Sequence, residues 1–254
     1  MIDAEFDRQV RVLISKGYPD LLGLTPEAFM DLVTPLRSAL PDADPPTPSR
    51  VPFVVVTPAP AHDTMPLTAL GKLTALDKRP GIADFDPDDL QRFTPIPTVR
   101  VPPGPAYLLV DVERGEKTLN VRPTDALEMI TEQDRTPLTV AEGIAFITAY
   151  PDSLERNNCF SLLASRCGDK RVPALWISKG APKLGWCWAG NPHTWLGSAS
   201  CQRRIMPSAL PSTGRSSSLT SGSAASSPGA IQRRSRVRSG SAPSAIGSAG
   251  SHRK

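Results

Sequence analysis

The residues best suited to metal chemistry are four cysteines and one histidine in the second half of the chain: Cys159, Cys167, Cys187, Cys201 and His193. Zinc takes four thiolate or imidazole ligands, which usually arrive in pairs two to four residues apart, so that one turn delivers two of them. The gaps between these cysteines are 8, 20 and 14 residues. The four cysteines are therefore the candidate metal ligands, but their spacing favours free thiols, and we expect no cofactor.

Cys167, Cys187 and His193 are also the candidates for thiol catalysis. Three basic residues flank Cys167, and nearby positive charge favours the reactive thiolate. Cys187 and His193, with Asn191 between them, could supply a nucleophile, a base and an orienting group. A thiol- or zinc-dependent enzyme is thus one reading, and the residues leave open whether the protein is an enzyme at all.

The four tryptophans lie within one short segment: Trp176, Trp186, Trp188 and Trp195. If residues 183–189 form a strand, Trp186 and Trp188 share one face while Cys187 points to the other. Exposed rings next to Asn191 would form a platform for a sugar, a base or a peptide, whereas buried rings would be the core beneath a sheet. We predict a binding domain that uses segment 172–197 to contact an unknown small molecule or a protein.

Apolar spacing and capping residues predict where the elements that hold these residues begin and end. Helices are predicted at residues 4–16, from Pro26 with a kink at Pro35, after a cap at Asp86, at 124–130, and after a capping box of Thr139 and Glu142. Strands are predicted at 53–57, in a hairpin of 107–112 with 118–121, and in a second hairpin of 172–178 with 183–189. Helices and strands come in blocks, which indicates an α+β fold with helices packed on antiparallel hairpins.

Charge divides the chain in two. Residues 1–201 contain all 25 Asp and Glu with 20 Lys and Arg, while residues 202–254 contain nine Lys and Arg and no acid. The first part is long enough to bury a core, and we predict that it is a single globular domain. The second part has 15 serines and no aromatic residue, so we predict a disordered Ser/Arg-rich tail. Its composition is also what GC-rich DNA yields when it is translated out of frame.

The tail contains a cluster of arginines: Arg233, Arg234, Arg236 and Arg238. Such a cluster could bind nucleic acid weakly and without sequence preference, through the phosphate backbone. The sequence has no apolar run long enough for a signal peptide or a membrane span. We therefore expect a cytoplasmic protein with reduced cysteines and no membrane partner.

Residues 167–169, 174–178, 182–190 and 195–197 resemble an uncharacterised actinobacterial family, and residues 1–7 and 106–112 are similar to it too. The resemblance covers roughly residues 1–201. It implies a domain of unknown function with no assigned activity, so no catalytic role is carried over to this chain. Members that it resembles end soon after the position of Cys201, which makes the long tail a departure from the family.

Overall fold

The computed structural model describes residues 2–68 and 79–207. Its α-helices are α1 (Ile2–Ser15), α2 (Tyr18–Leu21), α3 (Pro26–Val33), α4 (Ala61–Thr64), α5 (Pro87–Gln91), α6 (Pro123–Glu132) and α7 (Val140–Ala149). Its strands are β1 (Arg50–Val56), β2 (Ile82–Ala83), β3 (Thr94–Pro95), β4 (Tyr107–Glu113), β5 (Thr136–Pro137), β6 (Cys159–Ser161), β7 (Ser165–Arg166), β8 (Arg171–Ser178), β9 (Ala181–Trp188), β10 (Leu196–Ser198) and β11 (Ser200–Ile205). Short 3-10 turns are η1 (Thr34–Ala39), η2 (Met65–Leu67), η3 (Glu116–Thr118) and η4 (Pro151–Ser153). The predicted α+β fold class is confirmed.

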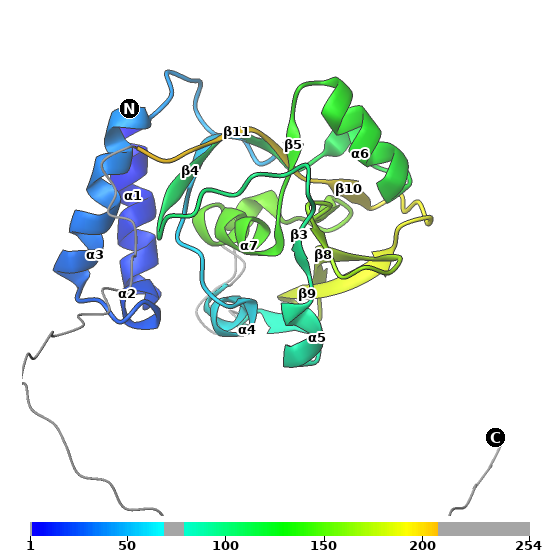
Figure 1. The fold of residues 1–254 in the computed structure, drawn as a ribbon, viewed down its shortest axis with the longest axis horizontal. Coiled ribbons are helices and arrows are strands. Elements are labelled where there is room, and N and C mark those ends of the chain that lie inside the picture. The colour runs from blue at the N-terminus through cyan, green and yellow to red at the C-terminus, as the bar shows by residue number, and fades with distance from the viewer. Residues whose placement is uncertain (1, 69–78, 208–254) are drawn as a thin grey trace, which may run out of the picture. The chain divides into compact units, whose positions relative to one another are not determined.

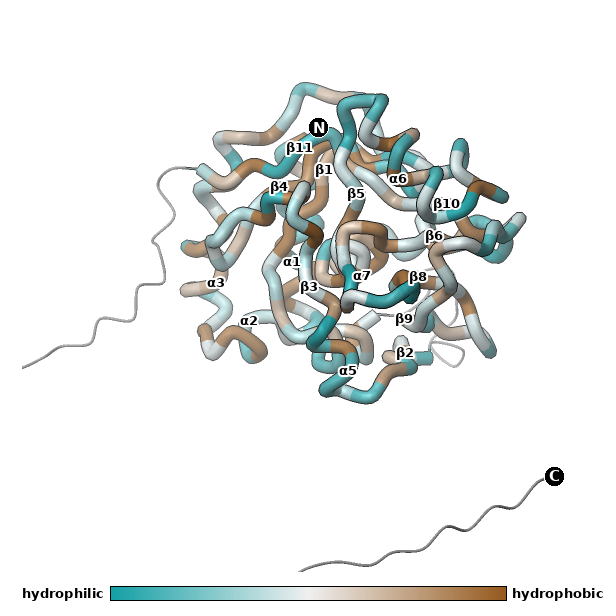
Figure 2. The backbone as a smooth tube through the Cα atoms, turned by 45° about the vertical axis from the view of Figure 1, so that its right-hand side comes forward, coloured by the Kyte–Doolittle hydropathy of each residue, from teal (hydrophilic) through white to brown (hydrophobic). Residues whose placement is uncertain are grey.

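Helix α7 lies between two sheets (Figure 1). Sheet A has the strand order β1-β4-β11-β5, and sheet B has the order β10-β6-β8-β9-β2. Nearly all of α7 is buried, and its apolar side chains share one core with side chains from both sheets. A helix that is apolar on all sides is stable only when other elements surround it. Figure 2 shows both β1 and α7 as brown, hydrophobic segments.

The other face of each sheet packs on helices as well. Side chains of α1 and α3 form a second core with sheet A, and side chains of α6 form a third, smaller core with sheet B. The order through the fold is therefore α1 and α3, sheet A, α7, sheet B and α6. A separate two-stranded sheet joins β3 to β7.

Local capping signals place several helix ends as predicted. The side chain of Thr139 accepts a hydrogen bond from the backbone N–H of Glu142, and the carboxylate of Glu142 accepts one from the N–H of Thr139, so the capping box is confirmed. Asp86 caps α5 by accepting from the N–H of Asp88. The α-helix that starts at Pro26 ends at Val33, and the chain continues as a 3-10 turn through Pro35.

One predicted hairpin is confirmed and the other is wrong. Strands β8 and β9 pair antiparallel around Lys179 and Gly180, which both have positive φ, as a two-residue hairpin turn requires. Strand β4 has no hairpin partner in residues 118–121, because β1 and β11 occupy its two edges. Its chain instead turns at Gly115, whose φ is 91°, and enters the short turn η3.

The folded domain extends beyond residue 201, its predicted end, because strand β11 continues past it. This strand pairs with β4 and β5 inside sheet A and runs to Ile205, four residues beyond Cys201. Residues 202–205 are therefore part of the folded domain and not of the tail. Of the rest of the predicted tail, residues 208–254 lie outside the described residues. Among the described residues, no helix has the length and apolar character needed to cross a membrane.

Strand β1 is at the edge of sheet A, and a side chain of α1 takes the place of its missing neighbour. The buried amide of Gln9 donates to the carbonyl of Phe53 at 3.1 Å and accepts from the N–H of Val55 at 2.9 Å. An unpaired edge strand exposes such groups to other chains. Here one glutamine satisfies both of them inside the protein.

Candidate functional site

A cavity of about 380 Å³ lies beside strands β8 and β9, and we call it the tryptophan pocket. It brings together all the residues that we predicted as ligand-binding candidates, and two of the three thiol-chemistry candidates. Its lining consists of Ala174, Trp176, Trp186, Cys187, Trp188, Asn191, His193, Trp195 and Leu196. Sequence reasoning missed Ala174 and Leu196, whose only signal was their place on the predicted strands or next to Trp195.

Strand pairing decides which side chains face this pocket. Val172 is opposite Cys187 in the β8–β9 ladder, so Cys187 shares a face with Trp176, four residues along β8 from Val172. The ring of Trp195, which comes just before β10, meets the ring of Trp176 edge-on at 6.4 Å. The His193 ring lies 5.3 Å from that of Trp195. These three rings form an aromatic wall next to the Cys187 thiol.

Trp176 depends on a glycine in the neighbouring strand. A Cβ atom at Gly185 would lie 2.2 Å from Cη2 of Trp176, which is far inside van der Waals contact. The indole therefore lies directly over the backbone of β9. Any side chain at position 185 would push the ring out of this position.

Trp186 and Trp188 belong to the other face of β9, as the alternation of a strand predicts. Their rings pack edge-on at 4.8 Å, and the guanidinium of Arg171 lies 5.8 Å from the centre of the Trp186 ring. They are 38% and 46% exposed. The four tryptophans therefore do not form one platform: one pair walls the pocket, and the other pair adds to its lining beside β9.

The pocket offers hydrogen-bonding groups but no charge. None of the residues that line it is Asp, Glu, Lys or Arg. Within residues 2–68 and 79–207, the hydrogen bonds of Asn191 and His193 use backbone atoms, so the amide and the imidazole are available to a ligand. The Sγ atom of Cys187 lies 3.8 Å from Oγ of Ser161.

The surroundings of the buried cysteines oppose thiolate formation. Burial raises the pKa of Cys187 and that of Cys159. Burial also raises the pKa of Cys201 to about 12. A thiol with a raised pKa is a poor nucleophile at neutral pH, since the thiolate is the reactive form.

Cys167 is next to a carboxylate, and Arg171, one of the three basic residues near it, donates to its Sγ atom at 3.6 Å as well as to carboxylates. Its thiol donates to Oδ1 of Asp169 at 3.2 Å, and burial together with this carboxylate raises its pKa. Arg171 donates to Asp169 at 2.8 Å and to Asp89 at 2.5 Å and 3.0 Å. The positive charge of Arg171 is thus balanced by Asp89 and Asp169.

The candidate metal ligands are not gathered into a site. In the described part of the chain, no group of three or more His, Cys, Asp or Glu side chains could hold a metal ion. All four cysteines are free thiols, with Cys159 and Cys201 buried in the main core. The arginine cluster at 233–238, expected to contact nucleic acid, lies outside the described residues.

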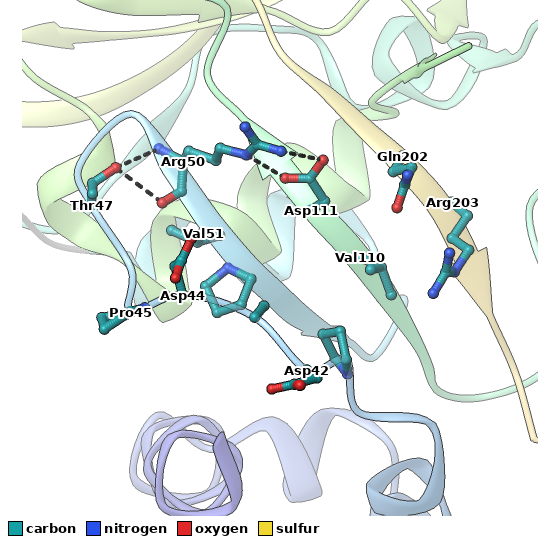
Figure 3. Close-up of a pocket in the computed structure, with 13 residues that line it drawn as sticks. Asp42, Asp44, Pro45, Thr47, Arg50, Val51, Val110, Asp111, Gln202 and Arg203 are labelled. Carbon is teal, nitrogen blue, oxygen red and sulfur yellow. Dashed lines mark hydrogen bonds and ion pairs between the residues drawn. The ribbon is translucent and has the colours of Figure 1, made fainter. Parts of the chain in front are cut away.

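A larger cavity of about 510 Å³ lies between the loop of residues 41–47, which precedes β1, and sheet A (Figure 3). On its sheet side, Arg50 donates to the carboxylate of Asp111 at 2.5 Å and 2.9 Å. Arg135 donates to the same carboxylate at 2.7 Å. These contacts pair Arg50 with Asp111, while Asp42, Asp44 and Arg203 also line the cavity. We place the candidate site in the tryptophan pocket, because it gathers the residues that the sequence singled out.

Asp111 also interrupts the alternation of sheet A. Val51 and Val54 of β1 face the same core, as do Leu109 and Val112 of β4, although three positions separate each pair. The pairing register of β1 with β4 is unchanged across this point. Asp111 lies inside the interruption of β4, opposite Pro52 of β1 in the register. Its φ of 55° is a conformation that Asp tolerates better than most residues. The only sequence signal was one carboxylate within an apolar strand.

The model of a family described as a family of unknown function (DUF5701) matches residues 12–207. This range reaches past Cys201 and includes the whole of β11. No curated protein and no solved structure matches the chain.

Proposed function

The chain belongs to DUF5701, a family of unknown function, and we propose that it binds a small, uncharged ring compound in the tryptophan pocket. The observation that carries this proposal is the joint lining of one cavity by Trp176, Trp195, His193 and Asn191. These residues come from β8 and from the segment before β10. An apolar cavity with a few polar groups is the usual form of a ligand site.

The size and walls of the pocket support a compact ring as the ligand. Its volume of about 380 Å³ is near the lower end for small-molecule sites, which run from about 300 to 1,000 Å³. Indole rings bind flat apolar surfaces, such as the face of a sugar or a nucleobase, through dispersion and burial of area. The pocket thus suits a ligand of roughly one or two rings.

The polar groups support a neutral ligand with hydrogen-bonding edges. Asn191 offers a donor and an acceptor, and a neutral imidazole at His193 offers one of each. No charged side chain lines the cavity, and the cations beside its rings, Lys183 and Arg171, already form ion pairs with carboxylates. A charged ligand would therefore lose its hydration without gaining an unpaired ionic partner. Methyl glycosides and uncharged nucleosides are the two probe classes that fit these demands.

Intrinsic fluorescence tests the proposal, because all four tryptophans of the chain line the pocket. We expect at least one probe of these two classes to change the emission of the full-length protein in a saturable way. Trp195→Ala should weaken that binding by about tenfold or more, since it removes one aromatic wall. Met30→Ala is the matched control, because Met30 is an exposed apolar residue on α3, 51% accessible, and binding should stay unchanged.

Two results would count against the proposal. One is a panel of methyl glycosides and nucleosides in which no compound gives a saturable signal. The other is a signal that Trp195→Ala leaves at full strength, which would place the ligand elsewhere.

We further propose a cytoplasmic setting. Four free thiols, two of them buried, support a reducing compartment. Labelling of intact cells followed by fractionation would test it, and recovery of the protein outside the cytoplasmic fraction would contradict it.

A further inference from the structure

Among residues 2–68 and 79–207, no strand pairs with the outer edge of β9 along half of its length. Strand β2 pairs with β9 only at Lys183 and Leu184, and the last contact is the bond from the N–H of Asp84 to the carbonyl of Leu184 at 2.8 Å. Strand β9 continues to Trp188. From residue 185 onward, β8 is the only strand beside it in the described part of the chain.

The direction of the backbone groups follows from this last contact. Because the carbonyl of Leu184 points away from β8, the backbone groups of Trp186 and Trp188 point away from β8 as well. The residue opposite Trp186 in β8 is Pro173, which has no N–H to donate, in agreement with this direction. The carbonyl of Trp188 accepts from the N–H of Asn191 at 3.1 Å. Among the described residues, the N–H and C=O of Trp186 and the N–H of Trp188 are thus left for another strand.

Large apolar side chains gather on the same two edge strands. The described residues contain five exposed large hydrophobic side chains, and three of them are Ile82 on β2 and Trp186 and Trp188 on β9. Proteins usually protect an open edge with proline, lysine or a bulge. This edge has none of these after Lys183, and instead presents two indole rings.

We propose that this edge binds an extended, basic segment of a partner protein, which adds a strand to sheet B beside Trp186 and Trp188. Free backbone donors and acceptors in a row are matched by another extended backbone, and the neighbouring side chains supply affinity through burial. Trp186 and Trp188 also line the tryptophan pocket, but the added strand pairs with the backbone edge of β9, so the proposal goes beyond the ligand in the pocket and does not depend on it.

Charge decides between a basic partner and a second copy of this chain. The exposed carboxylates Asp84, Asp86 and Asp88 directly follow β2, where an added strand would begin. Asp84 is paired with Lys183 at 2.7 Å, so Asp86 and Asp88 are the acids that meet a basic partner. Residues 1–201 are net negative, so edge-to-edge pairing of two copies would bring like charges together. A segment with lysine or arginine among alternating apolar residues fits both the backbone and the acids.

Selection from a display library of random heptapeptides on the full-length protein tests this inference. We expect enrichment of peptides that alternate apolar and basic residues. A synthetic copy of an enriched peptide is then measured by calorimetry in two N-methylated forms, each blocking every second amide. One form should bind at least about tenfold more weakly and the other nearly as well as the parent, because only alternate amides of an added strand face β9.

A protein variant gives a second measurement. Trp186→Ala should weaken the peptide by about tenfold, because it removes most of one exposed ring, while the Met30→Ala control should leave it unchanged. The inference is overturned if no peptide is enriched, if both methylated forms bind equally, or if sedimentation shows a dimer that Trp186→Ala dissociates. It is also overturned if replacing the arginines at 233–238 with serine strengthens peptide binding tenfold, since the chain's own segment would then be the occupant.

Discussion

The buried ion pair of Glu142 with Arg204 should be a main determinant of stability. Glu142 is fully buried, and the side chain of Arg204 is 5% exposed. Arg204 donates to the two carboxylate oxygens at 2.6 Å and 2.7 Å. The hydroxyl of Tyr107 donates to one of these oxygens at 3.0 Å, and the N–H of Thr139 donates to the other at 2.7 Å. The carboxylate therefore joins α7, β4 and β11.

Glu142→Gln keeps the shape of the side chain and removes its charge. In either orientation of the new amide, its NH₂ group faces two donors, and the buried guanidinium loses its counter-charge. Breaking one side of a buried pair costs about 3 to 5 kcal/mol, and we expect a loss of about 4 kcal/mol here. In a domain of this size each kcal/mol lowers Tm by about 2 to 4 °C, so Tm should fall by about 8 to 16 °C.

Urea unfolding followed by tryptophan fluorescence measures this cost. The matched control is Asp125→Asn, because Asp125 forms an exposed pair with Arg122 and its loss should cost less than about 1 kcal/mol. Replacing both Glu142 and Arg204 with leucine should cost at least about 2 kcal/mol less than the sum of the two single changes. A cost for Glu142→Gln below about 1 kcal/mol, or strict additivity in this cycle, would refute the reasoning.

Three further outcomes follow from particular contacts. Gly185→Ala should displace the Trp176 indole, change the near-ultraviolet circular dichroism and cost about 1 to 3 kcal/mol, whereas Gly190→Ala, where an added Cβ meets open space, should change neither. Bonds from two arginines outweigh burial and lower the pKa of Asp111, so its stabilisation is complete above the unfolded pKa and is lost as pH falls through the folded one. Asp111→Asn should therefore flatten the fall in urea midpoint between about pH 4 and pH 2, and an unchanged slope would contradict this. Gln9→Leu should cost about 2 kcal/mol or more in the same assay, because two buried backbone groups of β1 lose their partner, and a neutral effect would argue against the side chain's role at the edge.

The environment of the cysteines disfavours a thiol-dependent reaction, although cysteine is itself a suitable nucleophile. Cys187 and His193, the candidates for a nucleophile and a base, line the same pocket. The same pocket buries the thiol and places no charged side chain in its lining, and such surroundings favour the neutral form. The geometry therefore favours binding over nucleophilic catalysis.

Local signals in the sequence determined most elements of this fold. Several features depend only on residues within a few positions of one another: the capping box at Thr139, the cap at Asp86 and the turn at Lys179. They can therefore be predicted without tertiary information. The gathering of the tryptophans between residues 176 and 195 likewise marked the candidate site. Strand alternation even predicted that Cys187 would face away from Trp186.

Only the tertiary structure decided what depends on residues far apart in the chain. The segment from Gln202 to Ile205 has the composition of the basic tail, yet it is a central strand, because Glu142 is available 62 residues earlier to neutralise Arg204. Three other features also depend on residues far apart in the chain: the partner strands of β4, the contact of Trp176 with Trp195, and the unusual backbone conformation at Asp111. Periodicity and capping residues indicate which secondary structure a segment prefers by itself. A buried charge or a strand edge is stable only when a group from a distant part of the chain pairs with it.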